Sequence, residues 1–528
     1  MRLAAVFLML GAVVQAPAFA QAPAMPLPTP AEVGEYLTFT EADEVAPYLR
    51  RVAEAAEGIE AGSLPGAEEI PVIRLAADAA AGAAAAGGDA SPAGDGSGAA
   101  VRVLIVGAQH GDERAGLEVG LRIARDLAAG PLSALRGRLE VRIVPMANPG
   151  GVRGRDRLTP DGIDMNRDHI RLDDPGTRAL WREFTAWRPH VVLDLHEIGP
   201  SEYSIQIGVP THPNVDPELA VFGRYYMLPR AALALARADV RYHEYVAPWF
   251  EGSTMEIAAE PVDTASPGAS WYTPPPTEPV SARNAFGLAG SLAFLVETAS
   301  SRDVLGLEER TDRMYVAVAA LLAAAADLST DLRAASERAA AGAAGSLALR
   351  SRYVGRPAGA RLPWVFINER GQQEQGYLAP WRSKLQVDSE LARPAGWWIV
   401  GEPNGLVAAL KGHGFRVGEP GESAGAGPPG SDGWLEYPRC GDVTAGWPPP
   451  PRPIEGARPA PRGRWLAADQ PGARLLFTMV EPWSEGGWFD DRAADADGDA
   501  GAADADGGCA GAARASADSV FPVLRIER

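Results

Sequence analysis

The segment 101-VRVLIVGAQHGDERAGLEVG-120 decides the fold of this 528-residue chain. Its first six residues are apolar apart from Arg102, which is typical of a strand that is buried on both faces of a parallel sheet. A polar loop follows at Gly107–Asp112, and Arg114–Leu127 then has the composition of a helix. The segment therefore predicts a strand, a loop and a helix, the opening of a β-α-β unit.

Strand-like apolar runs alternate with helical stretches along the chain on both sides of this segment. The expected strands are Glu69–Leu75, Val101–Val106, Glu140–Pro145, Val191–Leu195 and Leu292–Glu297, and the expected helices are Arg114–Leu127, Pro175–Trp187, Asp216–Ala238 and Glu309–Leu332. This alternation predicts an α/β fold: a mixed, mostly parallel sheet with helices on both faces and ligand-binding residues at the strand ends.

Two of these strands end next to side chains of the kinds that bind metals. His110 and Glu113 lie in the loop after the first strand, and His196 ends the run Val191–Leu195. Two histidines and one carboxylate can hold a zinc ion and leave a position free for water. Because residues alternate faces along a strand, Asp194 points the same way as His196 and is expected to help line the site.

Further motifs stand between and after these residues in a specific order. They are N-P-x-G at 148–151, three arginines (Arg153, Arg155, Arg157), D-x-N-R at 164–167 and Glu297 on a late apolar strand. In this order the chain resembles the zinc carboxypeptidase family, the carboxypeptidase A-like metallopeptidases with their aspartoacylase and succinylglutamate desuccinylase relatives. The resemblance covers about residues 65 to 330. It implies the mixed α/β fold of that family and one zinc ion per chain.

The resemblance also implies a role for each matched residue. His110, Glu113 and His196 look like the zinc ligands, and Glu297 looks like the general base that activates water. Asn166 and Arg167 match the pair that holds a terminal carboxylate, which a guanidinium can grip through two hydrogen bonds. Arg157 is our choice for the arginine that stabilises the oxyanion, with Arg155 as the alternative. Tyr272 stands where the family has the tyrosine that caps the site, although no motif marks it.

Structural roles remain open for several of these residues. A lone strand histidine such as His196 is often satisfied by a backbone carbonyl, and Arg167 could form a salt bridge with Asp164 or Asp168. Glu297 could be a surface acid, but its apolar neighbours favour a buried carboxylate with a partner. His169 is expected either to contact the residues that bind the metal, without binding the metal itself, or to be structural. His190, His212 and His243 are not expected to be ligands.

The N-terminus has the pattern of an export signal. Met1 and Arg2 give a positive start, residues 3–14 are mostly apolar, and Ala18-Phe19-Ala20 resembles a cleavage site, which makes Gln21 the expected mature start. We therefore expect a signal peptide at 1–20 and a secreted or periplasmic protein. No later stretch reaches the roughly 18 to 20 uninterrupted apolar residues of a spanning helix, so no membrane span is expected.

Composition divides the remaining chain. Residues 21–64 are expected to be a spacer with a helix within Glu41–Glu57, which starts either near Glu41 or only at Pro47. Residues 65–335 should form the catalytic domain, with a low-complexity loop at 76–100. Residues 345–528 should form a small β-rich domain with strands at Arg352–Leu362, Gly396–Val400, Arg474–Met479 and Phe521–Ile526, a helix at Glu402–His413, a proline-rich connector at Trp447–Pro461 and a disordered stretch at 491–518.

Charge and cysteine content limit the partners. The net charge of −19 argues against nucleic acid as a partner. Cys440 and Cys509 are the only cysteines, and whether they pair in an oxidising compartment is left open. The aspartates of Asp495–Asp499 lack the spaced glutamate of a calcium loop, so no calcium site is expected there.

Three functions remain in view. The first is a zinc carboxypeptidase that acts on peptides with a free C-terminal carboxylate. The second is a deacylase or amidase that acts on N-acyl amino acids; the short interval of 86 positions between His110 and His196 is nearer to that branch. The third is a non-catalytic binding protein of the same fold, against which the presence of Glu297 argues.

Overall fold

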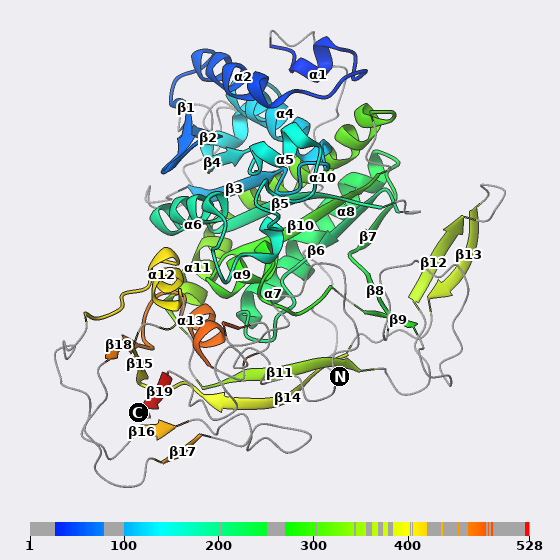
Figure 1. The fold of residues 1–528 in the computed structure, drawn as a ribbon. Helices are drawn as coiled ribbons and strands as arrows, with labels where there is room; N and C mark the ends of the chain where they lie inside the picture. The colour runs from blue at the N-terminus through cyan, green and yellow to red at the C-terminus, as the bar shows by residue number, and fades with distance from the viewer. Residues whose placement is uncertain are drawn as a thin grey trace, which may run out of the picture.

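The computed structural model describes residues 27–78, 100–199, 203–250, 270–273, 275–300, 304–342, 345–354, 384–401, 405–419 and 463–481, and short pieces between and after them (Figure 1). We call these the described residues. The expected signal peptide, most of the loop 76–100, the stretch 491–518 and both cysteines lie outside them, so the expectations about those segments stay predictions.

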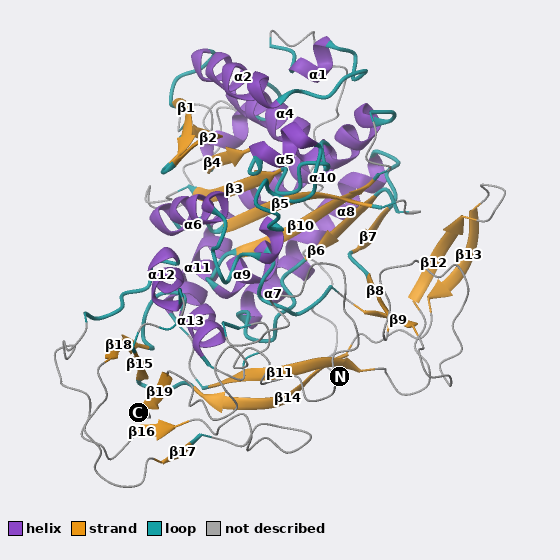
Figure 2. Cartoon of the chain, viewed as in Figure 1, coloured by secondary structure: helices purple, strands orange, loops and turns teal. Residues whose placement is uncertain are grey.

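An eight-stranded sheet forms the centre of the molecule (Figure 1, Figure 2). Its strand order is β1-β2-β4-β3-β5-β10-β6-β7, and four of its seven strand pairs are parallel. The strands are β1 (Ile59–Leu64), β2 (Ala67–Leu75), β3 (Val101–Gly107), β4 (Leu139–Val144), β5 (Val191–Ile198), β6 (Ile205–Gly208), β7 (Tyr242–Glu244) and β10 (Leu292–Ala299). The predicted α/β fold with a mixed, mostly parallel sheet is confirmed.

Helices cover both faces of this sheet, which explains why its inner strands are apolar throughout. Val103 and Ile105 of β3 pack into one core, and Leu104 and Val106 pack into the other. The first core contains α2 (Ala42–Glu54), α4 (Ala115–Ala129), α7 (Pro217–Phe222), α8 (Leu228–Arg237), α10 (Leu307–Asp327) and α11 (Ser329–Ala341). The second contains α6 (Pro175–Trp187), α9 (Ala282–Leu288), α12 (Leu406–Gly412) and α13 (Ala473–Val480).

The path of the chain reverses between β3 and β5. From β3 the chain passes through α4 to β4 on one side, and from β4 it passes through α6 to β5 on the other side of β3. The two crossovers, through α4 and α6, thus run on opposite faces of the sheet, and the carboxyl ends of the neighbouring strands β3 and β5 lie where the strand order reverses. Open α/β sheets bind ligands at such a point.

The structure corrects three predicted elements. The apolar stretch Arg474–Met479 is not a strand but helix α13, because a short apolar run does not distinguish a buried strand from a buried helix. The expected helix Glu309–Leu332 is two helices, α10 and α11, bent by 89° at Leu328. The later start at Pro47 is also wrong, since α2 begins at Ala42 after a capping box between Glu41 and Glu44.

The other described elements are short. Near the sheet they are α1 (Pro30–Val33), η2 (Ser133–Gly137), α5 (Pro149–Gly154), η3 (Met165–Arg167), η4 (Gly223–Met227), β8 (Ala247–Phe250) and β9 (Ser270–Thr273). The expected helix Asp216–Ala238 is thus α7, the π-helical turn η4 and α8 in succession. Among the described residues no single helix could cross a membrane; only the bent pair α10 and α11 has the length and composition when its two parts are joined.

The C-terminal part is rich in short strands, as predicted. It contains β11 (Ser346–Val354), β12 (Leu362–Ile367), β13 (Gln373–Leu378), β14 (Lys384–Ala392), β15 (Gly396–Val400), β16 (Trp434–Glu436), β17 (Arg452–Pro453), β18 (Gly463–Ala467) and β19 (Val523–Ile526). β11 pairs with β14, β12 pairs with β13, and the other five strands form one sheet. Trp397, Leu410 and Leu476 from this part join the second core beside α6 and α9.

Candidate metal centre

The loop after β3 carries the first two candidate ligands. Gly111 has no room for a side chain, because a Cβ there would lie 1.9 Å from the carbonyl carbon of Gly151. The loop is thus pressed against α5, which begins at the Asn-Pro-Gly-Gly motif. The amide of Glu113 donates to the carbonyl of His110 (3.2 Å), and this turn lets both side chains point to one side before α4 begins at Ala115.

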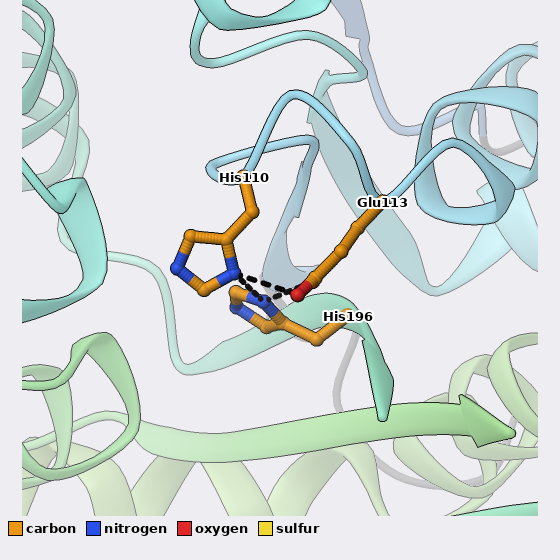
Figure 3. A group of neighbouring side chains, drawn as sticks. All are labelled: His110, Glu113 and His196. Atoms are coloured by element: carbon orange, nitrogen blue, oxygen red, sulfur yellow. Dashed lines mark hydrogen bonds and ion pairs between the residues drawn. The ribbon is translucent and has the colours of Figure 1, made fainter. Parts of the chain in front are cut away.

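The end of β5 brings the third candidate ligand to the same point. Ligand atoms of His110, Glu113 and His196 all lie within 4.8 Å of one another, and all three side chains are buried (Figure 3). The Glu113 carboxylate lies 2.9 Å from His110 Nδ1 and 2.8 Å from His196 Nδ1, and the two nitrogens are 3.1 Å apart. Ligands of a tetrahedral zinc ion, with bonds of about 2.0–2.2 Å, lie roughly 3.3–3.6 Å apart, a little farther than these side chains lie without an ion. The donor set and its spacing therefore fit a metal ion.

A carboxylate stands behind each histidine. His110 Nε2 lies 3.0 Å from Asp164 Oδ1, and His196 Nε2 lies 3.0 Å from Asp194 Oδ2. A carboxylate only accepts hydrogen bonds, so each of the two favours a proton on the Nε2 that faces it, which would leave Nδ1 to bind a metal. Asp194 was expected to help line the site. It lies against His196, on the side of the ring away from Glu113 and His110.

The charges of the metal-free cluster indicate where a cation would go. Burial opposes ionisation of Glu113, but His110 and His196 hold its pKa well below the usual value. Burial also opposes a charge on His196, but Asp194 and Glu113 hold its pKa well above the usual value. In the metal-free protein a proton thus lies between His196 and Glu113. A metal ion would take the place of that proton.

Glu297 lies directly beside this cluster. β10 pairs with β5 in parallel, and Glu297 is the register partner of His196, so both side chains project from the same face of the sheet. Glu297 is only 8% exposed, and its Oε2 has no hydrogen-bond partner among the described residues. Burial raises the pKa of Glu297 to about 7. A carboxyl group in this state can accept and release a proton near neutral pH.

Of the three arginines in and after α5, Arg157 reaches the cluster. Its Nε and Nη2 both donate to Asp164 Oδ2 (3.1 and 2.8 Å), and its Nη1 lies 3.2 Å from His110 Nδ1. Arg155 instead pairs with Glu41 (3.7 Å) and lies over the ring of Phe39. Arg153 pairs with Glu69 at the surface. The structure thus brings the first choice, Arg157, to the ligands and leaves the alternative outside.

The D-x-N-R motif forms the short helix η3 below the ligands. Asn166 accepts from the amide of Ala282 (2.8 Å), and its Nδ2 lies 3.0 Å from His196 Nε2. Arg167 donates to the carbonyl of Asn166 (2.8 Å), and no ion pair holds it among the described residues. Asp164 is instead paired with Arg157, while Asp168 accepts from two backbone amides.

Comparisons with known proteins agree with this arrangement. Residues 99–216 match the model of the succinylglutamate desuccinylase/aspartoacylase catalytic domain. A probable carboxypeptidase 2 from Arthroderma benhamiae is 28% identical over 211 residues, which are 38% of this chain and 38% of that protein. Carboxypeptidase 2 from Trichophyton equinum is 28% identical over 211 residues, 38% of this chain and 37% of that one. This part of the chain is zinc carboxypeptidase-like. The match spans less than two fifths of these relatives' length.

Solved structures of zinc carboxypeptidase-like proteins are more distant. A metallo-carboxypeptidase from Burkholderia cenocepacia shares 16% sequence identity, with a TM-score of 0.39 over 55% of this chain and 70% of that one. Carboxypeptidase A from Helicoverpa armigera shares 16%, with a TM-score of 0.38 over 55% and 75%.

Some residues near the candidate metal centre had no marker in the sequence. Tyr245, next to the sheet edge strand β7, has its pKa raised to about 12 by burial and by the charge of Glu297. Arg283 is 4% exposed and donates to the carbonyl of Pro276 (2.9 Å). Gln109, adjacent to His110, donates to Asp194 (2.6 Å). The predicted Tyr272 lies in β9, but its side chain is outside the described part.

Proposed function

We propose that this chain is an exported zinc metallocarboxypeptidase with one zinc ion held by His110, Glu113 and His196. The observation that carries the proposal is this buried set of donors, in which the Nε2 of each histidine faces its own carboxylate and the Nδ1 of each faces Glu113. The relatives named carboxypeptidase support the reaction class. The donors suit zinc, which accepts imidazole and carboxylate ligands in tetrahedral geometry.

The side chains around the ligands divide the work of peptide hydrolysis. Zinc, when bound, supplies a Lewis acid that lowers the pKa of water to about 7. Glu297 takes the proton of the attacking water and gives it to the leaving amine, for which its pKa near 7 is suited. Arg157, beside His110 and Glu113, donates to the substrate carbonyl oxygen as negative charge develops on it.

A substrate carboxylate would be bound next to these groups. Arg167 has a guanidinium that contacts only a backbone carbonyl among the described residues, so it can offer two parallel hydrogen bonds to a carboxylate. Asn166 would assist from the same turn, and Tyr272 would cover the bound substrate. The proposed substrate is therefore a peptide with a free C-terminus.

A deacylase is the second candidate, and a specific observation favours it. The matching family model is that of succinylglutamate desuccinylase and aspartoacylase, and it covers the segment that holds all three ligands. The same residues would then hydrolyse an N-acyl amino acid, with Arg167 on its carboxylate. A non-catalytic zinc protein has no observation of this kind in its favour.

Zinc content and a substrate panel test the proposal. The mature protein is expected to bind one zinc ion per chain and to release C-terminal residues from peptides in a chelator-sensitive reaction. Hydrolysis of N-acyl amino acids alone would move the assignment to the deacylase. Stoichiometric zinc without either activity would contradict both enzymatic functions. A protein without zinc affinity would contradict the metal centre itself.

Export is tested separately. In a bacterial host, the full chain is expected in the periplasmic fraction with Gln21 as its first residue, which intact mass measurement would reveal. A chain that keeps residues 1–20 and stays in the cytoplasm would contradict export without affecting the metal centre.

A further inference from the structure

A series of buried hydrogen bonds runs from Trp181 on α6 to Asp194, and an ion pair joins Asp194 to the candidate ligand His196. Trp181 Nε1 lies 3.1 Å from His169 Nδ1, and His169 Nε2 lies 2.9 Å from Gln109 Oε1. Gln109 Nε2 lies 2.6 Å from Asp194 Oδ1, and Asp194 Oδ2 lies 3.0 Å from His196 Nε2. We call this series the Trp181–His196 relay.

The hydrogen-bonding chemistry of these side chains determines which atom donates and which accepts in each link of the relay. An indole N–H can only donate, so His169 Nδ1 must accept from Trp181. Burial lowers the pKa of His169 to about 3, so its ring is neutral and its one proton is on Nε2. His169 therefore donates to Gln109 Oε1, which turns the amide nitrogen of Gln109 towards Asp194.

The last links of the relay place the proton of His196. The amide N–H of Gln109 occupies one oxygen of Asp194, which leaves the other oxygen to form the ion pair with His196 Nε2 at 3.0 Å. A proton on His196 Nε2 leaves Nδ1 as a lone pair that faces His110 and Glu113. The other tautomer would place an N–H at that point and exclude a metal ion.

A second neighbour of His196, Asn166, favours the other tautomer, in which the proton is on Nδ1. Asn166 Nδ2 lies 3.0 Å from His196 Nε2, and the Asn166 oxygen is occupied by the amide of Ala282, so it is the NH2 group that faces His196. An amide donor there favours a bare Nε2. The ion pair with the charged Asp194 carboxylate (3.0 Å) favours a proton on Nε2, and the relay keeps Asp194 in place.

Packing holds the relay away from water. Gln109, His169, Trp181 and Asp194 are each at most 1% exposed. His413 from α12 adds a hydrogen bond from its Nε2 to the carbonyl of His169 (2.9 Å) and packs on the Trp181 ring. A buried donor or acceptor that loses its partner costs about 1–3 kcal/mol, so the members of the relay support one arrangement.

We infer that Trp181, His169 and Gln109 are positioning residues that fix the tautomer of His196 and thereby set the zinc affinity of the metal centre. The inference rests on the proposed function, because zinc binding gives the tautomer its purpose. None of the three residues is expected to touch zinc or substrate.

Zinc affinity of the folded protein tests the relay. Gln109→Met and His169→Phe remove hydrogen bonds at nearly constant volume, and each is expected to raise the zinc Kd about 10–100-fold, as measured by competition with a chromophoric chelator. His169→Gln, which can place an amide N–H near the position of Nε2, is expected to restore most of the affinity. Trp181→Phe should have a smaller effect of the same sign.

Trp397→Phe is the matched control. Trp397 is also a fully buried tryptophan of the second core and donates through Nε1 to a carboxylate, Glu481, at 3.0 Å. This variant is expected to lose stability but to keep the wild-type zinc Kd. The relay is overturned if Gln109→Met and His169→Phe bind zinc within twofold of wild type, or if His169→Gln binds no better than His169→Phe.

A second measurement needs no variant. Long-range proton–nitrogen NMR spectra of the wild-type protein with 15N-labelled histidine are expected to show His169 protonated on Nε2 only. A proton on Nδ1 would overturn the direction of the relay. A wild-type protein that binds zinc but fails these tests would refute the relay alone, whereas one that binds no zinc would refute the proposed function and the relay together.

Discussion

The surroundings of His110 and His196 differ in kind. His110 lies on a loop, and its partner Asp164 is held by Arg157, a side chain that is 34% exposed. His196 lies on a central strand, and its partner Asp194 is fully buried and held by Gln109. We call the surroundings of His196 the strand side; they are packed like a protein core, so each group has one position. We call the surroundings of His110 the loop side; they are partly exposed and can adjust, which suits the side on which a substrate must enter.

Loss of each histidine gives the largest contrast. His196→Ala and His110→Ala are both expected to abolish zinc binding, as measured by metal analysis. In the metal-free protein, His196→Ala should also reduce the free energy of unfolding by about 3–5 kcal/mol, because Asp194 is left as a buried charge without its partner. His110→Ala should cost less, since Asp164 keeps Arg157. Urea unfolding measures both, and equal losses would remove the distinction between the two sides.

Glu297→Gln tests the catalytic part of the strand side. The amide has the same shape but cannot accept the proton of water, so kcat is expected to fall about 10²–10⁴-fold. The zinc content should stay at the wild-type level, because Glu297 is not one of the three ligands. Steady-state kinetics and metal analysis on the same preparation check this. Retained activity would remove Glu297 from the proposed mechanism.

Arg157→Gln tests the loop side. If Arg157 stabilises the developing negative charge, kcat/KM should fall about 10²–10³-fold while the zinc remains bound. Arg155→Gln is the matched control: it lies two residues away, pairs with Glu41 at the surface and should change kcat/KM less than twofold. An equal loss in both variants would indicate a general effect on the loop after α5 and not a catalytic role for Arg157.

The sequence could predict the parts of this site that local patterns determine. β3 and β5 were visible as apolar runs, and the polar residues at their ends, His110 and His196, had to meet because parallel strands present their carboxyl ends at one edge. The fold class followed from the same alternation of strands and helices. The motif order limited the oxyanion arginine to Arg157 with Arg155 as the alternative, and the structure separates the two.

Contacts between distant segments could not be predicted in this way. Gln109, His169 and Trp181 meet only because α6 packs on the second face of the sheet, and no spacing in the sequence encodes that meeting. α13 was mistaken for a strand because the run Leu475–Met479 is buried and carries no period of its own. β1, β6, β7 and α9 were missed because short elements have weak patterns.

The smallest expected effect concerns the pH dependence of the metal-free protein. Glu297 has a pKa of about 7 in the folded protein against an ordinary value of 4.5. The unfolded chain thus ionises first as the pH rises, so the stability that protonated Glu297 contributes is present below about pH 4.5 and is lost as the pH rises through 7. The full loss is about 3 kcal/mol, from a pKa difference of about 2.5 at 1.36 kcal/mol per pKa unit.

A comparison of two curves isolates this effect from the other titrating groups. Urea unfolding of the chelated wild type and of Glu297→Gln between pH 5 and pH 8 should give a variant that gains stability relative to wild type as the pH rises, because glutamine carries no proton to lose. A difference that stays constant over this range would mean that Glu297 is already ionised at pH 5. The strand side would then hold an unpaired charge in the metal-free state, and its contrast with the partly exposed surroundings of Arg157 would be weaker than the burial of Glu297 indicates.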